Sequence, residues 1–456
     1  MLLSGLLDEP GSDAGGGAGS PASGLGEALF AFAILTPLLF VVQLGSLAPA
    51  LSFAFTLLYG WARRGEAAAA LARRWPLLLI PAYALLSILW SDYPAVTAKH
   101  AGELCLTVMG GLLLSASRSP AGVLSGAWAA FGLFMTVSFA LGGTIHMGSM
   151  VSAEAAGTAF AGLNGVKNLF GMTAALAVLT SIFMLTRSAV RGAWAVFLAA
   201  AALIVVELYL VYVARSAGAL IGLVLAVCAF TVMGAMTPLS RAGRIVAASL
   251  MTVVLTGAAV LGYAFANTLT QTALDIFHKD PTLTGRSYLW YRAGDFIAER
   301  PLLGRGFEAF WVHGNIDAEG MWQYGQMTAR SGFNFHNTLI ELLIHFGWIG
   351  AALTVAVFLA AFVGLIRRCV LQPGAVSAFY VGFVVFQLVR MPFESLMPSS
   401  VDFATVLMFA ALGYGFHRLA QPVTIVRVET LPAAPVRAAP RRARPGWAAG
   451  RPSSIT

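Results

Sequence analysis

The chain has 456 residues, of which 58% are hydrophobic and only 11% are charged, and its net charge is +8. Soluble domains carry roughly 25% charged residues, so this composition excludes an ordinary water-soluble protein. The basic residues are mainly arginines in short gaps between apolar segments and in the C-terminal tail, a pattern that is typical of membrane topology and argues against nucleic-acid binding.

The two ends of the sequence differ in composition from the apolar middle. Residues 1–25 are acidic and rich in Gly and Ser, without the basic segment that opens a signal peptide, so we expect a disordered cytoplasmic N-terminus. From residue 421 onward the sequence turns to Pro, Ala and Arg. This composition predicts a disordered, basic cytoplasmic tail over residues 421–456 that rests on anionic lipid.

Apolar segments long enough to cross a bilayer recur from Gly26 almost to this tail. A span needs about 17 to 25 residues, because the hydrocarbon layer is roughly 30 Å thick and a helix rises about 1.5 Å per residue. We therefore predict an all-α polytopic membrane protein with about 12 transmembrane helices, in two groups within residues 26–266 and 336–420. The predicted spans cover residues 26–44, 46–62, 76–90, 100–117, 121–141, 168–186, 192–213, 216–235, 243–266, 337–366, 375–390 and 400–417.

Arginines mark alternate gaps between these spans. The positive-inside rule places such gaps in the cytoplasm, which predicts both termini inside and two long outer loops, at residues 142–167 and 267–335. The arginine-bearing gaps hold Arg63, Arg64, Arg73 and Arg74, then Arg118, then Arg187 and Arg191, then Arg241 and Arg244, and then Arg367 and Arg368.

Ionisable and polar side chains gather on the predicted outer side. An ionisable group at membrane depth costs at least roughly 2.5 kcal/mol, so each one needs a reason. The outer loops and the outer ends of spans carry Lys99, His100, Glu103, His146, Lys167, Asn168, Arg215, Arg286, Arg305, His336, Glu341, Arg390 and Glu394. We expect the functional site among them.

Two outer arginines are candidate phosphate ligands, since a guanidinium can bind two phosphate oxygens at once. Arg215 lies between the seventh and eighth spans, where the alternative is a residue that only ends a helix, and Glu207 is its candidate partner. Arg286 follows Thr284 and Gly285 at a predicted helix start, a place that favours anions. The alternative for Arg286 is a solvated surface position.

The outer loop at residues 267–335 contains a predicted amphipathic helix that lies on the membrane face. Apolar residues recur at helical spacing over residues 289–297, and Pro301 ends the run. A glycine-flanked turn follows at residues 303–306, which we expect to bring backbone N–H groups and the Arg305 guanidinium near a ligand. The alternative is a turn without a ligand.

The tenth span opens with a polar group. His336 stands at the predicted helix start, where the helix dipole keeps an imidazole neutral and able to accept a proton. The alternative for His336 is a residue that only caps the helix. Asn337 and Glu341 are four residues apart and therefore share one face of the helix.

Other polar residues are secondary candidates. Arg390 and Glu394 lie between the last two predicted spans, where they either line a groove or pair with each other across the turn. Lys167 and Asn168 stand at the outer end of the sixth span. His345, deeper in the tenth span, we interpret as a packing residue.

Together these motifs resemble the O-antigen ligase and Wzy-type polysaccharide polymerase superfamily, in particular its exopolysaccharide polymerase branch. The resemblance covers one continuous region, residues 207–350, and one upstream motif. Each motif is short, but their order, spacing and common outer location make the joint match specific. The motifs are Arg215 and Ser216 before a small-residue helix; Thr284, Gly285, Arg286 and Trp290; Pro301 to Phe307, with Arg305 at the free position; His336, Asn337, Gly347 and Gly350; and Gly162 to Gly171, with Lys167 and Asn168.

The resemblance implies a GT-C-like membrane glycosyltransferase in the bacterial inner membrane, with its active site on the periplasmic side. Such an enzyme joins a glycan from an undecaprenyl-diphosphate carrier to an acceptor hydroxyl without a metal or other cofactor. The outer loops hold no Asp-x-Asp metal-ligand motif and the three cysteines have no metal-ligand spacing, in agreement with this. Our hypothesis is that Arg215 and Arg286 hold the diphosphate while His336 accepts the proton of the attacking hydroxyl. The expected substrate-binding residues are Lys167, Asn168, Arg305, Asn337, Glu341, Arg390 and Glu394.

Two reactions stay open within this superfamily, because polymerase and ligase share the donor and differ in the acceptor. The acceptor is another carrier-linked repeat for a polymerase and lipid A core for a ligase. A chain-length regulator can accompany the polymerase. The Lys-Asn motif favours the polymerase.

A transporter of polysaccharide or lipid-linked sugar is the alternative of another class, although polar breaks at matching positions of two halves are not found. A non-catalytic scaffold, the third alternative, would tolerate loss of each outer polar residue.

Overall fold

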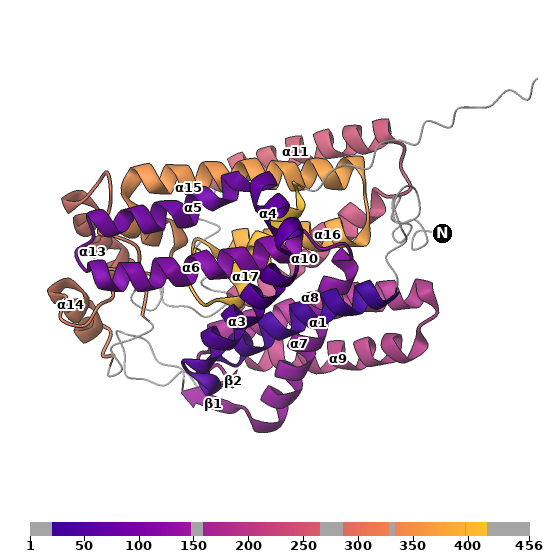
Figure 1. Ribbon diagram of the computed structural model, residues 1–456, viewed down its shortest axis with the longest axis horizontal. Coiled ribbons are helices and arrows are strands. Elements are labelled where there is room, and N and C mark those ends of the chain that lie inside the picture. The colour runs from indigo at the N-terminus through magenta and orange to yellow at the C-terminus, as the bar shows by residue number, and fades with distance from the viewer. Residues whose placement is uncertain (1–20, 147–157, 265–285, 328–332, 397, 417–456) are drawn as a thin grey trace, which may run out of the picture. The chain divides into compact units, whose positions relative to one another are not determined.

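The computed structural model describes residues 21–146, 158–264, 286–327, 333–396 and 398–416, and these residues are mostly helical (Figure 1). The predicted tail at residues 421–456 lies outside the described residues, whereas the first helix begins inside the segment expected to be a disordered N-terminus. The helices up to the first strand are α1 (Pro21–Leu39), α2 (Val41–Leu44), α3 (Leu47–Ala62), α4 (Arg64–Arg73), α5 (Trp75–Leu86), the short η1 (Ser87–Leu89), α6 (Pro94–Ser115) and α7 (Pro120–Leu141). The later helices are α8 (Lys167–Arg191), α9 (Trp194–Val213), α10 (Ala217–Ala235), α11 (Arg241–Ala264), α13 (Arg286–Glu299), α14 (Ile316–Tyr324), α15 (Thr338–Leu371), α16 (Ala375–Arg390) and α17 (Phe403–Tyr414).

Each predicted span coincides with at least one of these helices. By length and apolarity alone, α7, α8, α9, α10 and α15 can cross a membrane, and α4 with α5 makes a sixth span if this pair, bent by 87°, counts as one. Helices α1, α3, α16 and α17 are shorter apolar helices. The chain is therefore a multi-pass helical membrane protein, while the count of 12 spans and the GT-C architecture stay predictions.

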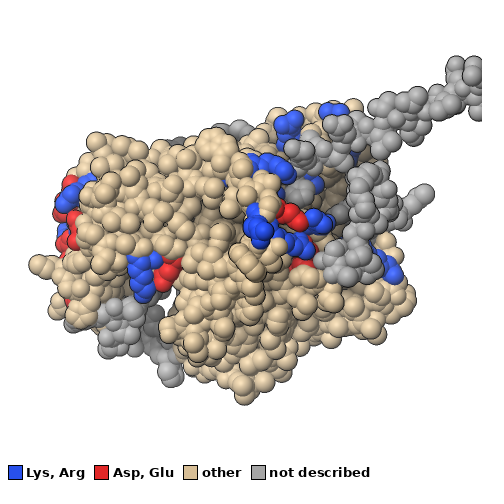
Figure 2. Space-filling model, viewed as in Figure 1, with Lys and Arg blue, Asp and Glu red and all other residues tan. Residues whose placement is uncertain are grey.

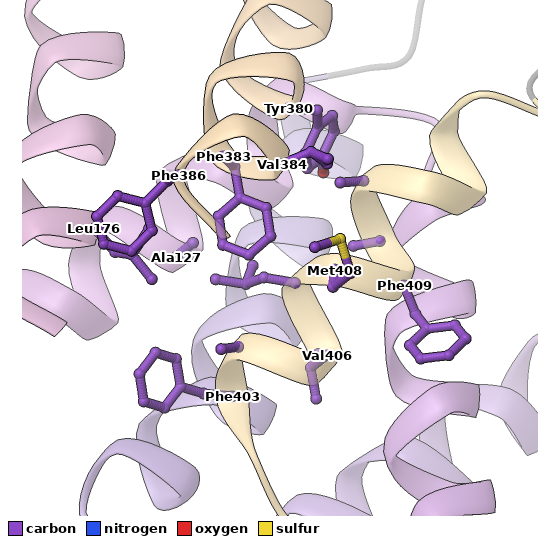
Figure 3. Close-up of a cluster of buried hydrophobic side chains, with 14 of the residues drawn as sticks. Ala127, Leu176, Tyr380, Phe383, Val384, Phe386, Phe403, Val406, Met408 and Phe409 are labelled. Atoms are coloured by element: carbon purple, nitrogen blue, oxygen red, sulfur yellow. The ribbon is translucent and has the colours of Figure 1, made fainter. Parts of the chain in front are cut away.

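Helix α17 lies at the centre of the main core. All of its residues from Phe403 to Tyr414 are buried, as expected of a helix that is apolar on every side. It packs against α6, α15 and α16, and α16 in turn packs against α10 and α8. Figure 3 shows side chains of α16 and α17, among them Phe383 and Met408, gathered in this core. The core thus anchors both ends of the loop at residues 391–402.

Charged side chains are concentrated near the helix ends. On the face shown in Figure 2, blue and red atoms gather over the region of α13 and the start of α6, and again around α4. Between these two regions, the described residues visible in this view are uncharged. A lipid-facing surface requires such an uncharged band, since a charge at the bilayer centre is costly.

The predicted outer loop at residues 142–167 contains a β-hairpin that the apolar pattern did not indicate. Strand β1 (Gly143–His146) pairs antiparallel with β2 (Thr158–Gly162), with Gly143 opposite Gly162. Strand β2 packs against α8, which follows it along the chain. The hairpin therefore lies next to the start of α8, where Lys167 and Asn168 stand.

The outer-loop helix predicted around residues 289–297 is present as α13, but its apolar face is covered by protein. Leu289, Ala293 and Phe296 are buried in a second, smaller core together with residues of α14 and of the segments that flank it. Phe310, Trp322 and Phe335 belong to the same core. We expected this apolar face to rest on the membrane, and that expectation is wrong because aromatic residues further along the chain cover it.

Helix α15 is broken at Gly347, where φ is 61° and ψ is −171°, and the segment at residues 301–306 lies against the break. A Cβ added at Gly304 would lie 2.6 Å from the Gly347 nitrogen, and one added at Gly347 would lie 2.3 Å from the carbonyl carbon of Leu302. Both φ values are positive, which favours glycine as well. Two of the motifs found in the sequence thus form one structural joint.

The glycine-flanked turn in this segment does not offer its N–H groups to a ligand. The Arg305 N–H donates to the carbonyl of Ile344 over 2.8 Å, and the Gly306 N–H donates to the carbonyl of His345 over 3.1 Å. These carbonyls belong to the turn of α15 just before the break. The prediction of a backbone anion site is wrong here, because the break in the helix uses those donors.

Candidate functional site

The carboxylate of Glu394 joins three of the predicted site residues. Asn168 Nδ2 donates to Glu394 Oε1 over 2.9 Å, and Arg286 Nη2 lies 3.4 Å from the same oxygen. His336 Nδ1 lies 3.4 Å from the other carboxylate oxygen, Oε2. These side chains come from the start of α8, the start of α13, the segment before α15 and the loop after α16. We call Asn168, Arg286, His336 and Glu394 the Glu394 cluster.

The electrostatics of the cluster keep Glu394 ionised. Burial alone would raise the pKa of Glu394, but the hydrogen bond with His336 and the positive charges of Arg286, His336 and Arg390 outweigh burial and hold the pKa below its usual value. An ionised carboxylate can only accept hydrogen bonds. In its neutral form, an imidazole that donates to this carboxylate carries its proton on Nδ1, and its Nε2 lone pair is then available as a proton acceptor.

His336 has an unusual backbone conformation and does not cap the helix. Its φ is 50°, in the left-handed region that is uncommon for residues other than glycine. Its N–H donates to Asn334 Oδ1 over 2.8 Å. Asn337 is the cap of α15: its Oδ1 accepts from the N–H groups of Leu339 and Ile340. The capping alternative thus applies to Asn337, while His336 turns toward Glu394.

Arg286 is the first residue of α13 and is held at two points. Besides Glu394, its guanidinium donates to the backbone carbonyl of Phe393. The side chain is 14% exposed, so it is not a solvated surface arginine. Thr284 and Gly285, which precede it in the sequence motif, lie outside the described residues.

Arg215 lies beside the cluster. It is exposed between α9 and α10, and its φ of 50° is again left-handed. The next residue, Ser216, donates through Oγ to Asn168 Oδ1 over 3.3 Å, which connects this turn to the Glu394 cluster. Glu207, the candidate partner of Arg215, instead accepts a hydrogen bond from Ser181 over 3.1 Å and is fully buried.

Lys167 and Arg390 lie in the segments that carry the cluster. Lys167 is the half-buried first residue of α8, next to Asn168. Arg390 is buried at the end of α16, with its guanidinium 5.3 Å from the ring centre of Phe386. Among the described residues, Arg390 Nε and Nη1 have no hydrogen-bond partner. The alternative pairing of Arg390 with Glu394 is not formed, because Glu394 pairs with Arg286 and His336.

The structure does not bring Arg305 to the cluster. Its buried guanidinium lies between acidic groups of the second core region, 2.9 Å from Asp317 and 3.9 Å from Asp92, and it also pairs with Glu299. This arrangement connects α13, α14 and the turn before α6. Arg305 thus holds α13, α14 and this turn together. Its predicted contact with substrate has no geometric support in these described segments.

Sequence reasoning missed Ser395, a neighbour of the His336 turn. Ser395 follows Glu394 and accepts a hydrogen bond from the Asn337 N–H over 3.3 Å, but a single serine gives no pattern. His345, which we interpreted as packing, has its Nε2 3.5 Å from Glu341 Oε2. The four-residue spacing of Glu341 and His345 on one helix face could have indicated this pair.

Two comparisons with known proteins address the family. A family model described as O-antigen ligase matches residues 176–355. The chain is also 29% identical over 341 residues to the exopolysaccharide production protein ExoQ of Rhizobium meliloti (strain 1021), an alignment that covers 72% of this chain and 74% of that protein. Both matches support the predicted resemblance to the O-antigen ligase and Wzy-type family. The similarities thus point to a membrane enzyme of the O-antigen ligase or polymerase type.

The O-antigen ligase match covers only part of the candidate site. Arg215, Arg286 and His336 lie within residues 176–355, whereas Asn168 and Glu394 lie outside this range. The family match therefore includes the proposed diphosphate ligands and the proposed base, and the structure adds the two groups that connect them. The roles of the individual residues stay predictions, which the experiments below address.

Proposed function

We propose that this chain polymerises undecaprenyl-diphosphate-linked oligosaccharide repeat units into exopolysaccharide or O-antigen at the periplasmic face of the inner membrane. The observation that carries the proposal is the Glu394 cluster, in which a carboxylate joins an imidazole to an arginine. This arrangement pairs a proton acceptor with a donor for anionic oxygens. The similarity to a protein named for exopolysaccharide production favours a polymerase, which adds to another carrier-linked repeat, over a ligase, which transfers to lipid A core.

In this proposal Arg215 and Arg286 bind the diphosphate of the donor. Guanidinium groups bind phosphate oxygens in pairs, and fixed positive charge stabilises the negative charge that develops on a leaving diphosphate. Arg286 is held in place by Glu394 and by the Phe393 carbonyl, so little reorganisation is needed when the donor arrives. Arg215 is exposed and can reach a donor that approaches from the outer leaflet.

His336 is proposed to activate the acceptor. The acceptor oxygen forms a bond to the anomeric carbon of the donor glycan while the bond between that carbon and the diphosphate oxygen breaks. The electron pair of the broken bond leaves with undecaprenyl diphosphate, and the acceptor proton moves to His336 Nε2. Glu394 orients the imidazole through Nδ1 and stabilises the positive charge that the imidazole then carries.

The ligase is the second candidate, since the matching family model carries that description. In a ligase the same donor chemistry transfers the glycan to lipid A core instead of to another carrier-linked repeat. A chain-length regulator is expected as a partner only for the polymerase. The two candidates therefore predict different lipid-linked intermediates when catalysis is blocked.

Arg286→Ala is expected to lower surface polysaccharide by about 10²-fold, because loss of one charge-stabilising donor has roughly that effect. The measurement complements a strain that lacks the protein and analyses its surface polysaccharide and lipid-linked pools. Arg292→Ala, on the same helix in an exposed pair with Asp295, is the matched control and is expected to retain activity.

The lipid-linked pools of the Arg286→Ala strain distinguish the candidates. Accumulation of single repeats on the carrier supports the polymerase. Accumulation of finished polymer on the carrier, without transfer to lipid A, supports the ligase. Normal pools and normal surface polysaccharide would reject both enzymatic functions and leave the transporter and scaffold alternatives.

A labelling experiment tests the proposed orientation, with both termini cytoplasmic and the α13–α14 region periplasmic. Gly320 is exposed on α14 and an added Cβ meets no atom within 4 Å, so Gly320→Cys is expected to fold normally. In a background without the native cysteines, a membrane-impermeant maleimide added to intact spheroplasts should label this cysteine, whereas a C-terminal cysteine should react only after lysis. Labelling of both sites in intact spheroplasts contradicts the topology.

A further inference from the structure

The backbone turn that presents His336 is held by specific contacts on both sides. With φ at 50°, the His336 backbone is in a conformation that a non-glycine residue keeps only when its surroundings impose it. Phe335 is fully buried, and Asn337 caps α15. The direction of the imidazole therefore depends on how the N–H groups of these two neighbours are bound.

Both of those N–H groups are hydrogen-bonded to the carboxylate of Glu341, one directly and one through the Ser395 hydroxyl. The Phe335 N–H donates directly to Glu341 Oε1 over 2.6 Å. The Asn337 N–H donates to Ser395 Oγ over 3.3 Å, and that hydroxyl in turn donates to Glu341 Oε1 over 3.3 Å. The indole of Trp311 lies 3.4 Å from the same oxygen. One carboxylate oxygen thus holds the His336 turn from both sides.

The surroundings of Glu341 argue against direct contact with substrate. Its side chain is buried, and its second oxygen faces His345 Nε2 at 3.5 Å without a hydrogen-bond partner among the described residues. The His345 ring is also buried and packs edge-on against Phe307. The Glu341 carboxylate is enclosed by the side chains of Trp311, Ser395 and His345. A glycan therefore cannot contact it in this arrangement.

We propose that Glu341 is a positioning residue that acts through His336. It fixes the left-handed turn so that the imidazole meets Glu394 and directs Nε2 toward the acceptor. This inference rests on the proposed role of His336 in catalysis. It replaces the expectation, made from the shared helix face of Asn337 and Glu341, that Glu341 lines the glycan groove.

We expect loss of the Glu341 carboxylate to lower kcat. Glu341→Ala leaves the Phe335 N–H and the Ser395 hydroxyl without their acceptor and frees the turn, and a displacement of about 1 Å can lower kcat by about 10²-fold. The KM for the lipid-linked donor should stay within twofold, since the arginines are untouched. Glu341→Gln keeps an oxygen that accepts from both donors, so we expect it to restore kcat to within about fivefold of wild type, with an unchanged pH profile.

The decisive test is a double-mutant cycle with the purified full-length protein in lipid nanodiscs, using its lipid-linked repeat as donor and acceptor. If Glu341 acts through His336, Glu341→Ala should cause no further loss when His336 is already alanine. Losses that multiply in the double variant overturn the inference, as does failure of Glu341→Gln to restore turnover in folded protein. Full activity of His336→Ala alone would instead reject the proposed catalytic role of His336.

A matched control separates positioning from general stability. Glu103 also forms a carboxylate–histidine pair, with His100 Nδ1 at 3.0 Å, and among the described residues no hydrogen bond or ion pair joins it to Phe335, His336 or Asn337. Glu103→Ala is expected to keep wild-type turnover. Thermal unfolding of each variant is recorded in the same nanodiscs, and equal loss of turnover in Glu103→Ala and Glu341→Ala would also overturn the inference.

Discussion

His336→Asn is expected to lower polymer formation by about 10²- to 10⁴-fold, the range that one general base supplies. Asparagine adopts the left-handed conformation more readily than most residues, so this replacement keeps the backbone turn while it removes the imidazole. His336→Ala should cause a similar loss. Initial rates with purified lipid-linked repeats, together with the amount of folded protein in the membrane, measure the effect.

The control for this prediction is another histidine of the predicted outer loop. His313 has a side chain that is 76% exposed and lies 3.3 Å from Glu319. His313→Asn is expected to keep wild-type rates, because an exposed pair contributes little. If His336→Asn retains more than about half of the wild-type rate, then the imidazole does not accept the proton and the catalytic assignment fails.

The helical fold could be largely predicted from the sequence, because an apolar segment of span length has only one stable form in a bilayer. The helix at residues 286–299 could be predicted from its periodicity as well. What covers its apolar face could not, since Phe310, Trp322 and Phe335 follow in segments without a regular pattern. The joint at Gly347 was visible only as two separate glycine motifs, and their close contact is a property of the folded chain.

The sequence grouped the side chains of the Glu394 cluster on one predicted side of the membrane, but it did not indicate their pairing. Glu394 lies 226 residues from Asn168, 108 from Arg286 and 58 from His336. Arg390, only four residues away, was the obvious local partner. The chain leaves the helix at Met391, so Arg390 stays buried in α16 while Glu394 reaches the other segments. The partners of Arg305, by contrast, are near in sequence. Glu299 and Asp317 were nevertheless not predicted to pair with it, because nothing distinguished them from the other charged residues of this region.

Glu394→Gln is expected to lower turnover by about 10²-fold or more. A neutral amide no longer requires the proton to be on Nδ1 of His336, and it removes the negative charge that stabilises the protonated imidazole and orients Arg286. Glu394→Asp keeps the charge but shortens the side chain by one methylene, so we expect an intermediate rate. Initial rates of the three proteins with the same donor preparation measure the effect.

The pH dependence gives this prediction a second observable. The pKa of Glu394 lies below its ordinary value of 4.5, so the carboxylate and its contacts are complete above that value and are lost only as pH falls through the lowered pKa. Activity of the wild-type protein between pH 5 and 8 should therefore show no titration of Glu394. Asp295→Asn, in the exposed pair on α13, is the control and should match wild type. Equal rates for Glu394→Gln and wild type would mean that the carboxylate neither orients His336 nor holds Arg286, and the Glu394 cluster would then be a structural contact at the junction of four segments.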